Sequence, residues 1–256
     1  MTLMFHPFRA VTLGAALSLM ALTAPAQAFD VTNMTEDERA ALREEIRSYL
    51  LDNPEVIMEA VGVLEQRQAE AQAVGDVDLV RVNAKEIFED GHSWVGGNPD
   101  GDITLVEFTD YRCSFCRRAH PELEQLLELD GNIRFIIKEF PILGEESVLS
   151  SRFAIAVKQV AGDAAYKAAH DALISYRGNI TPEALERIAG ELDLDAGAIM
   201  PQMTSDAVTE VIAANHALAG RLQISGTPTF ILEDQMLRGY MPLADMQRLV
   251  AQTRQE

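Results

Sequence analysis

Two cysteines lie three positions apart in the stretch Cys-Ser-Phe-Cys, and the 256-residue chain contains no others. A closed structural zinc site takes four ligands, so two thiols alone do not complete one. A stabilising disulfide normally ties together distant segments, which a pair this close does not do. Two neighbouring thiols can instead exchange two electrons with another disulfide. The spacing of Cys113 and Cys116 therefore predicts a redox-active pair.

The residues around the cysteines predict a strand, a turn and a helix. Residues 103–110 are β-branched and aromatic, as in a buried strand, and a helix follows from about Phe115. Cys113 would then lie at the helix N-terminus, where unpaired N–H groups and the helix dipole favour a thiolate. Cys116 would lie one turn later and more sheltered. We therefore predict that Cys113 attacks and Cys116 resolves.

Glu107 interrupts the apolar run of this strand, six residues before Cys113. One interpretation is a carboxylate that faces an edge or is held in a salt bridge. The strand pattern favours the other interpretation, a carboxylic acid buried beneath the cysteines. Burial would raise the pKa of Glu107 and let it relay a proton for Cys116.

Other polar residues near the turn leave two interpretations open. Arg112, Arg117 and Arg118 are either solvated helix-face residues or a source of positive potential that favours a thiolate. His120 follows the second cysteine by four residues, but with the cysteines it would make only an incomplete metal site. We therefore expect no metal, and we expect Pro121 to kink the helix.

A second landmark is the stretch Ser-Gly-Thr-Pro-Thr-Phe at residues 225–230. A proline that opens a strand belongs at an edge or at the first residue of the strand. A cis Thr227–Pro228 bond beside the cysteines would expose backbone that can pair with an extended, cysteine-containing substrate. A routine trans proline in a turn is the alternative.

The order of the predicted elements indicates an α/β fold. A strand at 103–110, a helix and a strand at 133–141 make a βαβ unit with a parallel pair. Residues 227–240 predict a hairpin, followed by a closing amphipathic helix. We expect a thioredoxin-like core with an inserted all-helical subdomain. The predicted boundaries are 91–143 and 225–256 for the core and 144–224 for the insertion, with residues 91–102 as a turn cluster.

Residues 1–28 have the features of a secretory signal peptide. Arg9 supplies a positive start, an apolar run covers residues 11–22, and Ala26-Gln27-Ala28 fits the cleavage rule. We therefore expect export to the periplasm, where disulfides are permitted. The formal charge of −19 argues against nucleic acid and anionic lipid as partners.

Residues 29–90 predict a helical arm and linker, with no strand signals. A capped, acidic helix start follows Thr35, Asn53-Pro54 begins a second helix, and residues 76–90 follow Gly75 as a further helix. The apolar stripe of the arm either packs on the main body or is buried against partner chains. The second interpretation predicts a homo-oligomer through residues 34–75.

Together these motifs resemble the DsbA-like family of exported thiol-disulfide oxidoreductases. The matching stretches are VEFTDYRCSFCRRAHPEL, KEFPILGEES and GTPTF. The resemblance covers residues 94–253 and implies a nucleophile at Cys113, a resolving thiol at Cys116 and a buried acid at Glu107. It also implies a cis proline at Pro228, with Thr227 contacting the substrate.

Two further comparisons bear on the direction of the reaction. The best-known oxidase of this family has Pro-His between its cysteines, where this chain has Ser114-Phe115. The arm is similar to the N-terminal segment of the suppressor-for-copper-sensitivity protein C branch, in which the arm serves oligomerisation and is associated with disulfide isomerisation.

We therefore expect an exported enzyme that forms or isomerises disulfides in secreted proteins, without a cofactor and recycled by a membrane redox partner. Oxidase and isomerase both stay open. The alternative is a copper-binding, copper-tolerance protein that holds Cu(I) on its thiolates without redox turnover.

Overall fold

The computed structural model describes residues 32–255, so the predicted signal peptide lies outside the described residues. The described part of the chain divides into two compact units, with the boundary between residues 61 and 62. The first unit holds α1 (Glu36–Asp52) and the start of α2 (Glu55–Val82). A capping box begins α1, because Thr35 Oγ1 accepts from the Glu38 backbone and the Glu38 carboxylate accepts from the Thr35 backbone.

The arm helices expose many large apolar side chains. No residue of α1 is buried. Leu51 is 66% exposed and Met58 on α2 is 69% exposed. Burying such side chains would be favourable by roughly 1.5–3 kcal/mol each, so the surface is apolar enough to associate.

The predicted helix boundary at Gly75 is wrong. Helix α2 runs through Gly75 to Val82, and the short α3 (Ala84–Phe88) follows. A helical glycine costs only about 1 kcal/mol relative to alanine. Two contacts beyond it compensate: Asp76 is ion-paired with Arg238, and Val80 is buried at 2% exposure.

A five-stranded sheet forms the centre of the second unit, in the order β1-β3-β2-β4-β5. The predicted βαβ unit is confirmed: β2 (Ile103–Thr109) and β3 (Ile133–Glu139) are parallel, with α4 (Ser114–Asp130) between them. The predicted hairpin is formed by β4 (Thr229–Leu232) and β5 (Gln235–Arg238). Strand β4 pairs antiparallel with β2, which brings residues 227–230 toward the turn before α4.

Residues 91–102 are not only a turn cluster, because they contain β1 (Trp94–Gly97), antiparallel to β3. Trp94 explains this strand. Its ring stacks on Tyr166 at 5.9 Å, and its Nε1 donates to the Asp163 carbonyl at 3.0 Å. These tertiary contacts stabilise a strand in a segment whose glycines and single proline favour turns.

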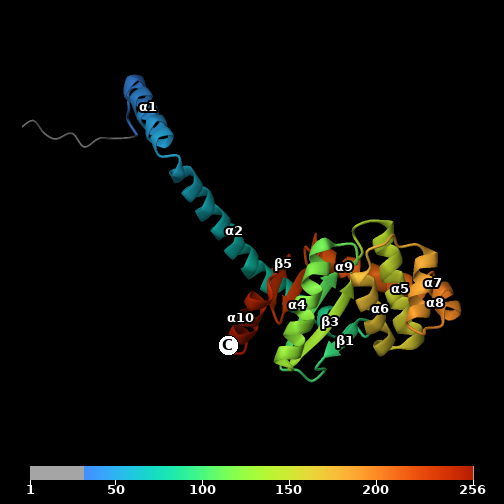
Figure 1. The fold of residues 1–256 in the computed structure, drawn as a ribbon. Helices are drawn as coiled ribbons and strands as arrows, with labels where there is room; N and C mark the ends of the chain where they lie inside the picture. The colour runs from blue at the N-terminus through green and yellow to red at the C-terminus, as the bar shows by residue number, and fades with distance from the viewer. Residues whose placement is uncertain (1–31, 256) are drawn as a thin grey trace, which may run out of the picture. The chain divides into compact units, whose positions relative to one another are not determined.

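Both faces of the sheet are covered (Figure 1). One face packs on α4 and α10 (Leu243–Thr253), and the other packs on α9 (Asp206–Arg221), α3 and the end of α2. The core on the face covered by α4 and α10 also contains apolar side chains from the helical insertion, among them Phe153, Leu173 and Leu185. The inserted helices are therefore continuous with the core that holds the site.

The insertion between β3 and β4 is entirely helical. Its first helices are α5 (Glu145–Ala161), α6 (Asp163–Ser175) and α7 (Pro182–Glu191), with Thr181 capping α7 and Pro182 at its first position. The additional helix α8 (Ala196–Gln202) precedes α9. Among residues 32–255, no helix is both long and apolar enough to cross a membrane. The order of helices and strands confirms the predicted α/β thioredoxin-like fold with helical elements.

Candidate active site

The turn between β2 and α4 holds both cysteines. Cys113 is the N-cap residue of α4, and its Sγ accepts from the Cys116 backbone N–H at 3.5 Å. Cys113 is 6% exposed and Cys116 is 1% exposed. The first thiol therefore lies at the dipole end of the helix, as predicted, with the second thiol one turn deeper.

The two thiols differ in acidity. The hydrogen bond with the Cys116 side chain, assisted by Thr227 and two helix N–H groups, lowers the pKa of Cys113 to about 5. Burial, the shared proton and the nearby Glu107 carboxyl raise the pKa of Cys116. At neutral pH Cys113 is therefore the thiolate, and Cys116 keeps its proton.

Asp110 fixes the shape of this turn, although the sequence pattern alone did not single it out. Its fully buried carboxylate accepts from the backbone N–H groups of Ile142 and Leu143 at 2.8 and 3.0 Å and from Ser147 Oγ at 2.7 Å. It also accepts from the Arg112 backbone at 2.8 Å. The carboxylate therefore joins the cysteine turn to the loop after β3.

The Thr227–Pro228 bond is cis and lies beside the cysteines. Cys113 Sγ is 3.1 Å from the Thr227 carbonyl oxygen. The interpretation as a routine trans proline is therefore wrong. The backbone of residues 227–228 borders the reactive sulfur, where the backbone of a bound peptide would have to pass.

Glu107 is buried, at 3% exposure, on a strand that has neighbours on both sides. The interpretation as an edge-facing carboxylate is wrong, because β2 lies between β3 and β4. Burial raises the pKa of Glu107 to about 8. The acid is therefore mostly protonated at neutral pH, as a proton relay for Cys116 requires.

The three arginines near the turn are all engaged. Arg112 forms an ion pair with Glu146 at 3.1 Å and donates to the Gly178 carbonyl at 3.1 Å. Arg117 Nε donates to the Tyr111 carbonyl at 2.9 Å. The side chains of Arg112 and Arg117 therefore hold the turn in place through these contacts and also add positive charge to it.

An aromatic surface borders Cys113. Phe115, between the cysteines, is 54% exposed and stacks on Tyr240 with ring centroids 6.4 Å apart. The Arg118 guanidinium lies 4.4 Å from the centre of the Tyr240 ring. Pro121 lies inside α4, which continues to Asp130. The exposed side of the dithiol is therefore apolar and positively charged.

A second buried acid, Glu139, accepts three hydroxyl hydrogen bonds. Tyr111 and Tyr166 donate to its Oε1 at 2.7 and 2.6 Å, and Ser151 donates to its Oε2 at 2.7 Å. Burial raises the pKa of Glu139 to about 7. Glu139 ends β3 directly after Lys138, so the sequence marks its burial less clearly than it marks that of Glu107, which lies between two apolar residues of β2.

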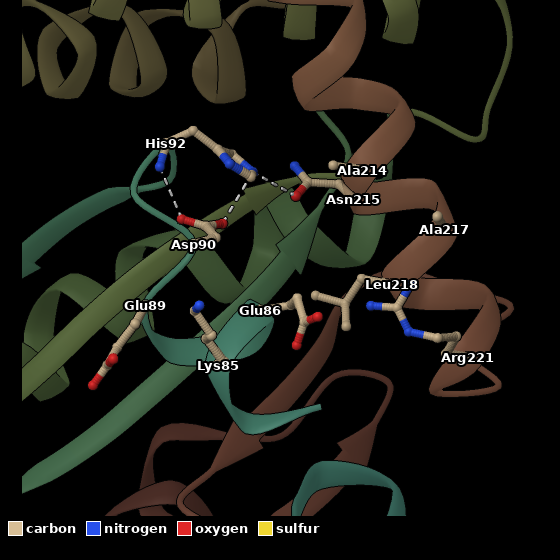
Figure 2. A pocket seen from close by; sticks show the side chains of 10 residues that line it. All are labelled: Lys85, Glu86, Glu89, Asp90, His92, Ala214, Asn215, Ala217, Leu218 and Arg221. Atoms are coloured by element: carbon tan, nitrogen blue, oxygen red, sulfur yellow. Dashed lines mark hydrogen bonds and ion pairs between the residues drawn. The ribbon is translucent and has the colours of Figure 1, made fainter. Parts of the chain in front are cut away.

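A separate cavity of about 360 Å³ lies between α3, the following loop and α9 (Figure 2). His92 Nε2 is 3.0 Å from Asp90 Oδ2 and 3.3 Å from Asn215 Oδ1. Burial alone would raise the pKa of Asp90, but the buried Lys138 ammonium lowers it to about 2. Neither cysteine lines this cavity, so it is not part of the dithiol site.

Residues 104–251 match the DSBA-like thioredoxin domain. The chain belongs to this family. Residues 38–71 match the N-terminal domain of the copper resistance protein ScsC. The resemblances expected from the cysteine motif and from the arm are both confirmed.

Solved structures agree with this assignment. A thioredoxin-like oxidoreductase from Silicibacter pomeroyi DSS-3 is 38% identical, with a TM-score of 0.63 over 67% of this chain and 98% of that one. BcfH from Salmonella enterica Typhimurium is 28% identical, with a TM-score of 0.68 over 83% and 94%. The catalytic domain of Proteus mirabilis ScsC shares the fold at 24% identity, with a TM-score of 0.65 over 70% and 99%.

Curated relatives include longer proteins. The Na(+)/H(+) antiporter NhaA 1 of Salinispora arenicola is 29% identical over 146 residues, which are 57% of this chain and 22% of the antiporter. This chain thus spans about a fifth of the length of these relatives.

Proposed function

We propose that this chain is an exported, periplasmic enzyme that forms or isomerises disulfides in secreted proteins. One observation carries the proposal: a low-pKa thiol at a helix N-terminus lies 3.1 Å from the carbonyl that precedes a cis proline. The thiolate is the form that attacks a disulfide sulfur. The DsbA-like family supports thiol-disulfide exchange, and the ScsC and periplasmic thioredoxin-like neighbours support the location.

As an oxidase, the enzyme begins with a Cys113–Cys116 disulfide. A substrate thiolate attacks Cys113 Sγ, the mixed disulfide forms, and the Cys116 sulfur leaves and takes up a proton. A second substrate thiolate then attacks the mixed disulfide and expels the Cys113 thiolate. The substrate loses two electrons and the enzyme gains them, so a membrane redox partner must remove them again.

As an isomerase, the reduced enzyme starts the exchange. The Cys113 thiolate attacks a substrate disulfide and releases one substrate thiolate, which can attack another disulfide of the same substrate. If no rearrangement follows, the Cys116 thiol loses its proton and resolves the mixed disulfide. In the proposed mechanism Glu107 relays this proton, and Thr227 and Pro228 hold the substrate backbone.

Serine variants of the two cysteines test the proposal. Cys113→Ser should abolish insulin reduction, because it removes the attacking sulfur. Cys116→Ser should accumulate mixed disulfides with secreted proteins, because it removes the resolving sulfur. A Cys113→Ser protein that reduces insulin at the wild-type rate would overturn the assignment.

The ScsC N-terminal match favours one second candidate, a copper-tolerance protein. Two thiolates suit Cu(I), which prefers soft sulfur ligands. Tight Cu(I) binding together with no insulin reduction by the wild-type protein would support this function in place of exchange.

A further inference from the structure

Two histidines and an aspartate meet where α4 packs against α6. One donor atom from each of His120, His170 and Asp171 lies within 4.8 Å of the others. His120 Nε2 is 3.3 Å from Asp171 Oδ1. Two ligands of a tetrahedral zinc ion, each ~2.0–2.1 Å from the metal, are roughly 3.3 Å apart. This pair therefore already has the separation that a shared metal ion needs.

We propose that His120, His170 and Asp171 form a binding site for a divalent transition-metal ion of the zinc type, with a fourth position open to water. Two imidazoles and one carboxylate suit Zn²⁺ and its neighbours in the first transition row, whereas Mg²⁺ prefers oxygen ligands. In sequence His120 had no co-ligands other than the cysteines. The packing of α6 on α4 supplies them.

Hydrogen bonds around His170 hold its ring and fix its tautomer. Tyr111 donates its hydroxyl hydrogen to Glu139 at 2.7 Å, so its oxygen is left to accept from His170 Nδ1 at 3.0 Å. This network places the imidazole proton on Nδ1 and a lone pair on Nε2. Metal-bound histidines are commonly held by such a hydrogen bond on their other nitrogen.

The site has both a rigid side and an open side. His170 is buried at 2% exposure, while the side chains of His120 and Asp171 are 17% and 41% exposed. An ion can therefore enter along His120 and Asp171 and meet a fixed imidazole at the inner end. The formal charge of −19 also attracts cations to the protein surface.

A lysine now occupies part of this site. Lys167 Nζ lies 2.7 and 2.8 Å from the two Asp171 oxygens and 3.2 Å from Glu124. A bound metal ion would compete with this ammonium for the carboxylate. Removing the lysine charge should therefore strengthen metal binding, the opposite of what general damage to the fold would do.

The test uses the tag-free mature chain carrying Cys113→Ser and Cys116→Ser, so that thiolates cannot bind the probe. Co²⁺ is titrated by visible absorbance, and Zn²⁺ is titrated by calorimetry with Mg²⁺ as the comparison ion. We expect one Zn²⁺ per chain, about tenfold weaker binding for His120→Gln, and about threefold tighter binding for Lys167→Met.

His92→Gln is the matched control, because His92 also lies beside a carboxylate, that of Asp90, but in the separate cavity between α3 and α9. Circular dichroism verifies that each variant is folded. The proposal is overturned if the dissociation constant for Zn²⁺ is weaker than about 1 mM. It is also overturned if Mg²⁺ binds equally well or if His120→Gln and His92→Gln have the same effect.

Discussion

The pKa of Cys113 is lowered and that of Cys116 is raised, because the two thiols lie at different ends of one helical turn. Helix N–H groups and the neighbouring thiol stabilise negative charge on Cys113, while burial and Glu107 disfavour it on Cys116. A negative charge on the inner sulfur would raise the energy of the buried site. The asymmetry assigns attack to one thiol and resolution to the other.

The first prediction concerns the acidity of Cys113. In the reduced protein, thiolate absorbance in the ultraviolet should rise as the pH increases through about 5, because the pKa of Cys113 is lowered to that value. Cys113→Ser should lose this transition, and Cys116→Ala should shift it upward, because alanine removes the side-chain donor that makes the largest stabilising hydrogen bond to Cys113. A wild-type transition near ~8.5, the value of an ordinary cysteine, would contradict the proposed activation.

The second prediction concerns Glu107. Its folded-state pKa of about 8 lies above the ordinary 4.5, so the folded protein binds the extra proton and loses stability as the pH rises from 4.5 to 8. Glu107→Gln removes this loss. Relative to wild type, the variant should gain about 4 kcal/mol in unfolding free energy between pH 5 and pH 9, because the folded-state pKa lies about 3 pH units above pH 5, at about 1.36 kcal/mol per unit.

Urea unfolding at both pH values measures this gain. The exposed Glu65→Gln on α2 is the control and should change the pH difference by less than about 0.5 kcal/mol. Equal pH dependence in wild type and Glu107→Gln would show that Glu107 ionises normally in the folded protein.

At the scale of elements, the active turn depends on contacts from three separate segments. Asp110 joins it to the loop after β3, the Thr227 carbonyl contacts it from the segment before β4, and Arg112 donates to Gly178 in the loop after α6. The helical insertion thus supports the redox turn as well as enlarging the core.

The third prediction tests the Asp110 junction. Asp110→Ala leaves two buried backbone N–H groups and a serine hydroxyl without their acceptor, each at a cost of about 1–3 kcal/mol. We expect a loss of about 3 kcal/mol or more in chemical unfolding, together with slower insulin reduction. Asp234→Ala, in the exposed hairpin turn, is the control; equal stability losses in the two variants would refute the role of Asp110.

At the scale of the whole molecule, the redox domain is joined to an arm with an apolar surface. The arm matches the ScsC N-terminal domain over residues 38–71. A multimer would place several dithiols around one misfolded substrate, which favours isomerisation over simple oxidation. We therefore propose that residues 34–75 form a homo-oligomer.

The fourth prediction tests this assembly with the full-length mature chain. Ile57 and Leu64 are 50% and 56% exposed, so Ile57→Glu with Leu64→Glu should not disturb the redox core. The double variant should have a monomer mass in light scattering and lose the refolding of scrambled ribonuclease, while insulin reduction persists. A wild-type protein that is already monomeric and only oxidises would remove the isomerase proposal.

The sequence by itself determined the features that depend on local chemistry. The spacing of Cys113 and Cys116, the strand that precedes them and the capped helix starts each follow from neighbouring residues. The burial of Glu107 was also visible, because a carboxylate flanked on both sides by apolar strand residues is carried into the core with them. These signals were enough for the fold class and the family.

Only the tertiary structure decided which distant residues meet. Strand β1 is stabilised because the Trp94 ring stacks on that of Tyr166, which lies 72 residues later in the sequence. This contact outweighs the turn preference of the residues next to Trp94. Likewise, His120 gains His170 and Asp171 only through the packing of α6 on α4. Local patterns contain no information on such pairings, because the free energy that selects them comes from burial and hydrogen bonds between residues that are distant in the sequence.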